Sequence, residues 1–162
     1  MAVARDMRRC AVQALYQFDA SGSEDPEAVR KTLESSPGTD RTRNEGFRLA
    51  TGAWGQREQA DAELAPYTPE WPTHRQPVID RSILRLAWYE IVEAGTPPKV
   101  VINEAVELAR EFSTEKSPLF INGVLDRFYK GRLPGEENDD DSAGDEAMRE
   151  HEEHPPPGSY SH

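Results

Sequence analysis

Apolar residues recur at helical spacing throughout Asp80–Phe128, which has the clearest pattern in the chain. Three helices are predicted here, separated by short breaks that contain proline or serine. The first runs from about Val78 to Ala94, with Gly95 suited to its C-terminal cap, and its apolar stripe is Ile79, Ile83, Leu84, Leu86, Ala87, Trp88 and Ile91. The second runs from about Lys99 to Phe112, with Ile102, Ala105, Val106, Ala109 and Phe112 on one face. The third begins at Ser117-Pro118 and presents Ile121, Val124, Leu125 and Phe128.

Three more helices are predicted in the first half of the chain. The first spans Ala4–Asp19, and the second begins at Asp25-Pro26, a cap residue followed by proline, and reaches about Leu33. The third runs from about Asn44 to Leu64; its three glycines weaken it by up to about 1 kcal/mol each but allow close helix approach. The proline-rich segment Tyr67–Pro77 is predicted to be a loop. No period-two strand pattern is convincing, so the fold class is all-α, a bundle of about six or seven helices.

Charge divides the chain into two parts. Residues 134–162 carry ten acidic residues and one basic residue, whereas residues 1–133 carry 20 acidic and 18 basic ones. The net charge of -11 therefore belongs mainly to the C-terminal segment. A segment with so few apolar residues cannot offset the entropy lost on ordering. We therefore predict a helical domain over 1–133 and a disordered acidic tail over 134–162.

Signals for catalysis and for metal binding are weak. The four histidines, His74, His151, His154 and His162, do not combine with cysteines in a metal-ligand pattern. There is no glycine-rich phosphate loop between a strand and a helix, and no nucleophile elbow. The interpretation is a protein that is not an enzyme and uses no cofactor or metal.

The sequence also lacks a pattern for export or membrane insertion. It has no run of about 18 apolar residues and no signal peptide. The single cysteine, Cys10, lies among apolar residues, so a buried thiol is preferred over a reactive one. These observations predict a cytoplasmic protein with no membrane contact.

Three arginines, Arg5, Arg8 and Arg9, open the first predicted helix and are interrupted by Asp6. A guanidinium group pairs bidentately with phosphate and stacks on bases, so RNA binding is one interpretation. Cations oppose the dipole at a helix N-terminus, which favours an anionic ligand there. A solvated helix start explains the same pattern equally well.

Polar residues inside the apolar helices have simpler explanations. Asn103 and Asn122 lie near the stripes of their helices, and an interhelical hydrogen bond that fixes packing is the preferred interpretation. Glu104 and Glu107 are better explained by a solvated face or by contacts to the backbone than by acid–base catalysis.

Three segments resemble the NusB family of bacterial transcription antitermination factors. They are RRCAVQALYQFD (Arg8–Asp19), DRSILRLAWYEI (Asp80–Ile91) and PPKVVINEAVELAREFSTEKSPLFINGVLDRF (Pro97–Phe128). The combination of INEAVELA with FINGVLDR at this separation is specific to that family. With a weaker match over Phe47–Tyr67, the resemblance covers about residues 4–130.

The resemblance implies an all-helical protein of two small helical subdomains. It also implies binding to the boxA element of ribosomal RNA operon leaders together with NusE, a small-subunit ribosomal protein, in a complex that helps RNA polymerase to read through terminators. Self-association into a homodimer, through the face that would bind RNA, is known in such families.

Site residues follow from the resemblance by motif. Arg5, Arg8 and Arg9 match the arginine-rich N-terminal segment, and Tyr67, Lys116 and Phe120 match positions that border the RNA. Tyr16 and Asp80 match positions that face NusE. The chain departs from the family in two ways, because Asp6 interrupts the arginines and Lys116 stands where members often carry an acid.

Alternatives remain for these residues and for the function. Tyr16 and Phe120 could be core aromatics, Tyr67 could cap the loop, and Asp80 could be an N-terminal helix acid. The chain could be a NusB-like domain related to ribosomal RNA cytosine methyltransferases, which would need a nucleotide-binding domain after about residue 130. It could also be a helical interaction module without an RNA role.

Overall fold

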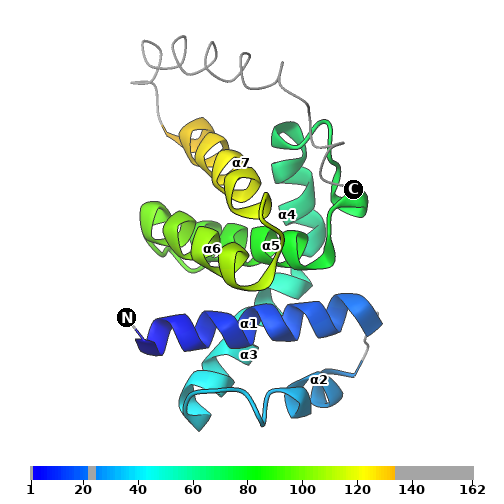
Figure 1. The fold of residues 1–162 in the computed structure, drawn as a ribbon, viewed down its shortest axis with the longest axis vertical. Helices are drawn as coiled ribbons and strands as arrows, with labels where there is room; N and C mark the ends of the chain where they lie inside the picture. Colours follow the sequence, from blue (N-terminus) through cyan, green and yellow to red (C-terminus); the bar gives the residue numbers. More distant parts are fainter. Residues whose placement is uncertain (1, 22–24, 134–162) are drawn as a thin grey trace.

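The computed structural model describes residues 2–21 and 25–133, and this part of the chain forms helices and no strand (Figure 1). Its α-helices are α1 (Ala2–Ser21), α2 (Pro26–Thr32), α3 (Asp40–Gly55), α4 (Arg57–Leu64), α5 (Val78–Val92), α6 (Pro98–Phe112) and α7 (Ser117–Arg132). Two 3-10 helices, η1 (Ala65–Tyr67) and η2 (Thr73–Arg75), lie between α4 and α5. The prediction of an all-α bundle is confirmed. The predicted disordered tail, 134–162, lies outside the described residues.

The helices form two groups along the long axis of the molecule. In Figure 1, α1 crosses α3 with α2 beside them in the lower half, and α4, α5, α6 and α7 fill the upper half. Gly46 lets α3 approach α1 closely, because a Cβ there would lie 2.5 Å from the Met7 carbonyl oxygen and 2.6 Å from the Cys10 Cβ. This agrees with the expectation of close approach for Gly46, whereas no atom of another described helix lies close to the Cβ position of Gly55.

The predicted helix from Asn44 to Leu64 is wrong in its boundaries, because the structure divides it into α3 and α4. Helix α3 begins four residues earlier, where the Thr39 side chain accepts a hydrogen bond from the Thr42 backbone and the Thr42 side chain accepts one in return. It ends at Gly55, next to Gln56, whose φ of -111° and ψ of 18° lie outside the helical region. The weak helix propensity of glycine is consistent with a break at this position.

The other helix ends follow local signals to different degrees. Asp25 caps α2 by accepting a hydrogen bond from the Ala28 backbone, as predicted. Gly95 adopts a φ of +70° after α5, as suits a residue that ends a helix. The predicted Ser117 cap is wrong, because Ser117 lies inside α7 and its hydroxyl binds elsewhere.

The hydrophobic core continues through both helix groups. Trp88 is fully buried in α5 and donates a hydrogen bond from its indole nitrogen to Glu63, 3.0 Å away. Phe18 stacks on Phe47 and Trp54, with ring centroids 6.3 and 5.6 Å away. In the predicted stripe of α6, Ile102, Ala105 and Ala109 are buried as predicted, whereas Val106 is half-buried and Phe112 is exposed.

An ion-pair network fixes α1 to α5 and α5 to α4. The Arg81 guanidinium donates to both oxygens of Asp19 at 2.6 and 2.7 Å, and Arg85 donates to both oxygens of Asp61 at 2.9 and 2.7 Å. Arg85 also reaches Asp19 at 3.0 Å, which joins the two pairs. Burial disfavours the Asp19 charge, but the two guanidinium groups outweigh it and lower the pKa of this carboxyl.

Candidate nucleic-acid interface

The arginines of α1 lie against a row of carboxylates on α6. Arg5 donates to both oxygens of Glu104 at 3.3 and 3.0 Å. Arg9 donates to Glu111 from Nε and to Asp6 from Nη1, both at 2.9 Å. The hydrogen bond from Arg5 lowers the pKa of Glu104, with burial acting in the opposite direction. The helix start is therefore not merely solvated, because its cations are paired within the protein.

Arg8 is not on the surface, which contradicts its prediction as an RNA contact. Its Nε and Nη2 donate to the two oxygens of Glu90 at 2.9 and 2.8 Å, and the side chains are 7% and 4% exposed. A second carboxylate, that of Glu104, lies 3.9 Å away. Burial opposes the charge of Arg8, but Glu90 and Glu104 outweigh it and raise the pKa of the guanidinium. Arg8 therefore joins α1 to α5.

Four aromatic residues pack together in two pairs along α7, and two of them, Trp71 and Phe128, are buried. Phe120 meets Trp71 edge to face, with ring centroids 4.7 Å apart, and Tyr67 meets Phe128 edge to face at 6.2 Å. Arg127 donates to the Tyr67 carbonyl oxygen at 3.0 Å and so ties η1 to this helix. Tyr67 and Phe120 are half-buried, which leaves part of each ring accessible.

Lys116 is exposed just before α7 and lies on the same side of that helix as Phe120 and Arg127. Residues four apart are neighbours on one helix face, and residues seven apart return to nearly the same direction. The structure therefore aligns Lys116, Phe120 and Arg127 along one side of α7, beside η1. Two of these residues, Lys116 and Phe120, are predicted RNA contacts, and Arg127 binds the backbone of a third, Tyr67.

Asp80 is fully buried in the first turn of α5, which contradicts its prediction as a residue that directly faces a partner. Its carboxylate accepts hydrogen bonds from the Ser113 and Ser117 hydroxyls, the latter at 2.9 Å. Burial raises the pKa of the Asp80 carboxyl, and the two hydroxyl hydrogen bonds only partly offset this effect. Asp80 therefore anchors the joint between α6 and α7, from which Lys116 projects.

Tyr16, the other predicted partner-facing residue, is 39% exposed on α1. It borders a largely apolar groove of about 390 Å³ that also includes Val12, Ile79 and Phe112. The exposed ring of Phe112, which the helical period placed in the core, belongs to this groove. Cys10 lies at its base, buried as predicted, and burial raises the pKa of its thiol.

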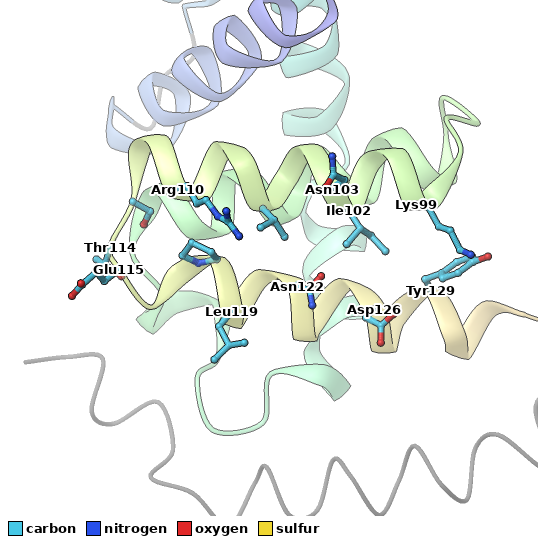
Figure 2. A pocket seen from close by; sticks show the side chains of 13 residues that line it. Lys99, Ile102, Asn103, Arg110, Thr114, Glu115, Leu119, Asn122, Asp126 and Tyr129 are labelled. Carbon is cyan, nitrogen blue, oxygen red and sulfur yellow. The ribbon is translucent and has the colours of Figure 1, made fainter. Parts of the chain in front are cut away.

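A second groove, of about 920 Å³, separates α6 from α7 (Figure 2). Asn103 and Asn122 project into it from the two helices, and both side chains are exposed. The predicted interhelical hydrogen bond is absent between these two residues. Leu119 lines the same groove, on a different side of α7 from Phe120.

Sequence reasoning missed Trp71, although a tryptophan in a proline-rich loop is a detectable signal. It also missed the distant acid partners of the α1 arginines, which are Glu104, Glu90 and Glu111 and which no local spacing reveals. Across residues 2–21 and 25–133, no cluster of three or more histidine, cysteine, aspartate or glutamate side chains is arranged to hold a metal ion. No helix in the same ranges has the length and apolar character needed to cross a membrane.

Comparison with known proteins identifies relatives that cover most of the chain. The transcription antitermination protein NusB of Symbiobacterium thermophilum is 41% identical over 136 residues, which cover 78% of this chain and 89% of that protein. The NusB of Streptomyces griseus is 39% identical over 132 residues, covering 79% of this chain and 92% of that protein. Both are named as antitermination proteins and not as enzymes, in agreement with the non-catalytic interpretation.

Solved structures agree with the fold. The structure of T. maritima NusB superposes with a TM-score of 0.68 at 32% identity, covering 80% of this chain and 92% of that chain. A chain from a complex of the antitermination factors NusB and NusE with double-stranded RNA gives a TM-score of 0.71 at 24% identity, covering 81% and 98%, and supports the fold alone. The sequence model of the NusB family matches residues 5–130, and the chain therefore belongs to the NusB family.

Proposed function

We propose that this protein is a cytoplasmic transcription antitermination factor that binds boxA-type single-stranded RNA of ribosomal RNA operon leaders together with NusE. In this role it joins the RNA polymerase antitermination complex and promotes full transcription of ribosomal RNA genes. The observation that carries the proposal is the alignment of Lys116 and Phe120 along one side of α7, with Tyr67 packed on Phe128 of the same helix, in a chain that belongs to the NusB family.

The chemistry of this surface suits single-stranded RNA. Unpaired bases stack on aromatic rings, and lysine and arginine neutralise phosphates. Phe120 and Tyr67 are half-buried aromatic residues, and Lys116 supplies an exposed cation one turn before Phe120. Arg5 and Arg9 supply two further cations, whereas Arg8 is excluded by its burial. Three phosphate contacts would give a slope of log K against log salt of about -2, at about -0.7 per contact.

Phe120→Ala is expected to weaken binding of a boxA-type RNA by about 1–3 kcal/mol, because a stacking ring is lost. The slope of log K against log salt should stay nearly unchanged, since no cation is removed. Binding is measured by fluorescence titration at several salt concentrations, with NusE present.

Leu119→Ala is the matched control for Phe120→Ala. Leu119 is an exposed side chain of the same helix, but it lines the groove between α6 and α7. This variant should bind RNA as the parent protein does. Equal losses in both variants would assign the effect of Phe120→Ala to the stability of α7 and would count against stacking.

For NusE, we propose the groove that Tyr16 borders. Its lining is mainly apolar, and partly exposed aromatic side chains such as Tyr16 and Phe112 are typical anchors of protein interfaces. Asp80 would act on this interface indirectly, since Ile79, its neighbour in α5, lines the groove.

Tyr16→Ala is expected to weaken NusE binding by about 2 kcal/mol or more, as for a central aromatic anchor. The melting temperature of the protein alone should change little, because Tyr16 is 39% exposed. Isothermal titration calorimetry and a thermal melt measure the two effects. Unchanged NusE affinity would remove this groove from the interface.

A chain that bound NusE but showed no affinity for boxA-type RNA, alone or with NusE, would be a helical interaction module. The paired state of the α1 arginines gives this alternative a physical basis, because each of the three already contacts a carboxylate.

A further inference from the structure

Arg9 of α1 donates hydrogen bonds to two carboxylates. A phosphate that bound Arg9 would accept hydrogen bonds from the same guanidinium nitrogens. Its Nε contacts Glu111 and its Nη1 contacts Asp6, each at 2.9 Å. Arg9 is about one-third exposed and Glu111 is 41% exposed, so this pair is accessible to solvent, and both side chains also line the groove that Tyr16 borders. The hydrogen bond that Arg9 donates to Glu111 raises the pKa of Arg9, with burial acting against it.

A carboxylate and a phosphate compete for one guanidinium group. Both accept hydrogen bonds from the planar fork of arginine, and the fork cannot serve both fully at once. A solvent-exposed ion pair is weak, so a phosphate can displace its carboxylate. The displaced carboxylate then remains close to the phosphate and repels it.

The position of the pair relates it to the proposed RNA surface. Glu111 lies in the last turn of α6, five residues before Lys116, and Arg9 is the arginine of α1 that reaches this end of α6. Arg5 contacts the same helix two turns earlier, at Glu104. The charge of Glu111 therefore lies against the arginines of α1, in the last turn of α6 before the joint to α7.

We infer that Glu111 is an intramolecular competitor that limits the affinity of this protein for RNA by occupying Arg9. The inference rests on the proposed function, since it assumes that RNA reaches this end of α1. In this role Glu111 of α6 lowers the affinity for RNA although it makes no favourable contact with the RNA itself. The buried pair of Arg8 and Glu90 takes no part, because it is closed to solvent.

Glu111→Gln tests the inference, because glutamine keeps the size of the side chain and removes its charge. The full-length variant should bind a boxA-type oligonucleotide about two to five times more tightly than the parent protein, which is the range for removing one exposed pair. The affinity is measured without NusE and again with NusE at a concentration that saturates both proteins, because Arg9 and Glu111 also line the groove proposed for NusE. A scrambled oligonucleotide of the same length should show a similar gain, because phosphate contacts carry no sequence information. The melting temperature should stay the same.

Glu107→Gln is the matched control. Glu107 lies one turn away on α6, is 40% exposed against 41% for Glu111, and pairs with Arg110 and not with an arginine of α1. It removes the same unit charge, and it should raise RNA affinity less than Glu111→Gln. In a chain that already carries Arg9→Gln, the change Glu111→Gln should lose most of its effect.

The outcomes separate the inference from the proposed function. If the parent protein binds the RNA and Glu111→Gln matches either the parent or Glu107→Gln, the competitor role is overturned while RNA binding stands. A gain that persists in the Arg9→Gln background would also overturn it, as a general charge effect. If neither the parent nor any variant binds the RNA, the proposed function fails and the inference fails with it.

Discussion

Arg8→Ala is expected to lower the free energy of unfolding by about 3–5 kcal/mol. The variant leaves the Glu90 carboxylate buried without the two guanidinium hydrogen bonds that now satisfy it. An uncompensated buried charge costs far more than the loss of a surface pair. Urea unfolding followed by circular dichroism measures the effect as a lower midpoint with a similar slope.

Two further variants make this result specific to the buried pair. Arg9→Ala, one residue along the same helix, should change the free energy of unfolding by no more than about 1 kcal/mol, because its pairs face solvent. The double variant Arg8→Met/Glu90→Leu should recover much of the lost stability, since apolar residues can replace a buried pair. If Arg8→Ala were as stable as Arg9→Ala, Arg8 would not be the internal link described above.

Asp80→Lys is expected to destabilise the protein by more than about 4 kcal/mol, which is in the range of the most severe single substitutions. Asp80 is fully buried, and its contacts are the hydroxyls of Ser113 and Ser117, which cannot neutralise an ammonium group. Weaker NusE binding in this variant would therefore follow from loss of structure. Asp80→Asn keeps the shape and one acceptor, and should stay within about 1 kcal/mol of the parent.

The difference in stability between the parent protein and Asp80→Asn is expected to depend on pH. The pKa of Asp80 in the folded state is raised above its ordinary value of 3.8, so the folded protein binds this proton more tightly than the unfolded chain does. The stability from Asp80 is fully present below pH 3.8 and is lost as the pH rises through the raised pKa. The parent protein should therefore lose stability relative to Asp80→Asn over this rise. A constant difference between the two would contradict the burial of a titrating carboxyl.

The sequence predicted the helices well because most of them carry their own boundary signals. The period of α6 and the Asp25-Pro26 start of α2 are local, and the structure contains both. The break at Gln56 was missed, because an apolar period can continue across a short interruption of the backbone. Phe112 satisfied the period of α6 and is nevertheless exposed, since the period does not show where the neighbouring helices end.

The candidate site was harder to predict, because its chemistry depends on residues that are distant in sequence. Arg8 and Glu90 are 82 residues apart, and Asp80 and Ser117 are 37 apart. The resemblance to the family indicated which positions could bind RNA. Only the packing of α1 against α5 shows that one of them, Arg8, is a buried ion-pair residue and not a surface contact. Tyr67, Lys116 and Phe120 were predicted together; Lys116 is exposed and the other two are half-buried, and their contact with RNA stays a prediction.

The long sequence separation of the α1 ion pairs has a consequence for synthesis of the protein on the ribosome. Arg5 and Arg9 precede their α6 partners by 99 and 102 residues. At about 5–20 residues per second, roughly 5–20 s pass between their translation and that of Glu104 and Glu111. During this interval the nascent chain presents guanidinium groups that its own carboxylates on α6 cannot yet neutralise. Arg5 and Arg9 are therefore most accessible to anions before α6 is synthesised. Once α6 has folded against α1, Glu104 and Glu111 pair with them.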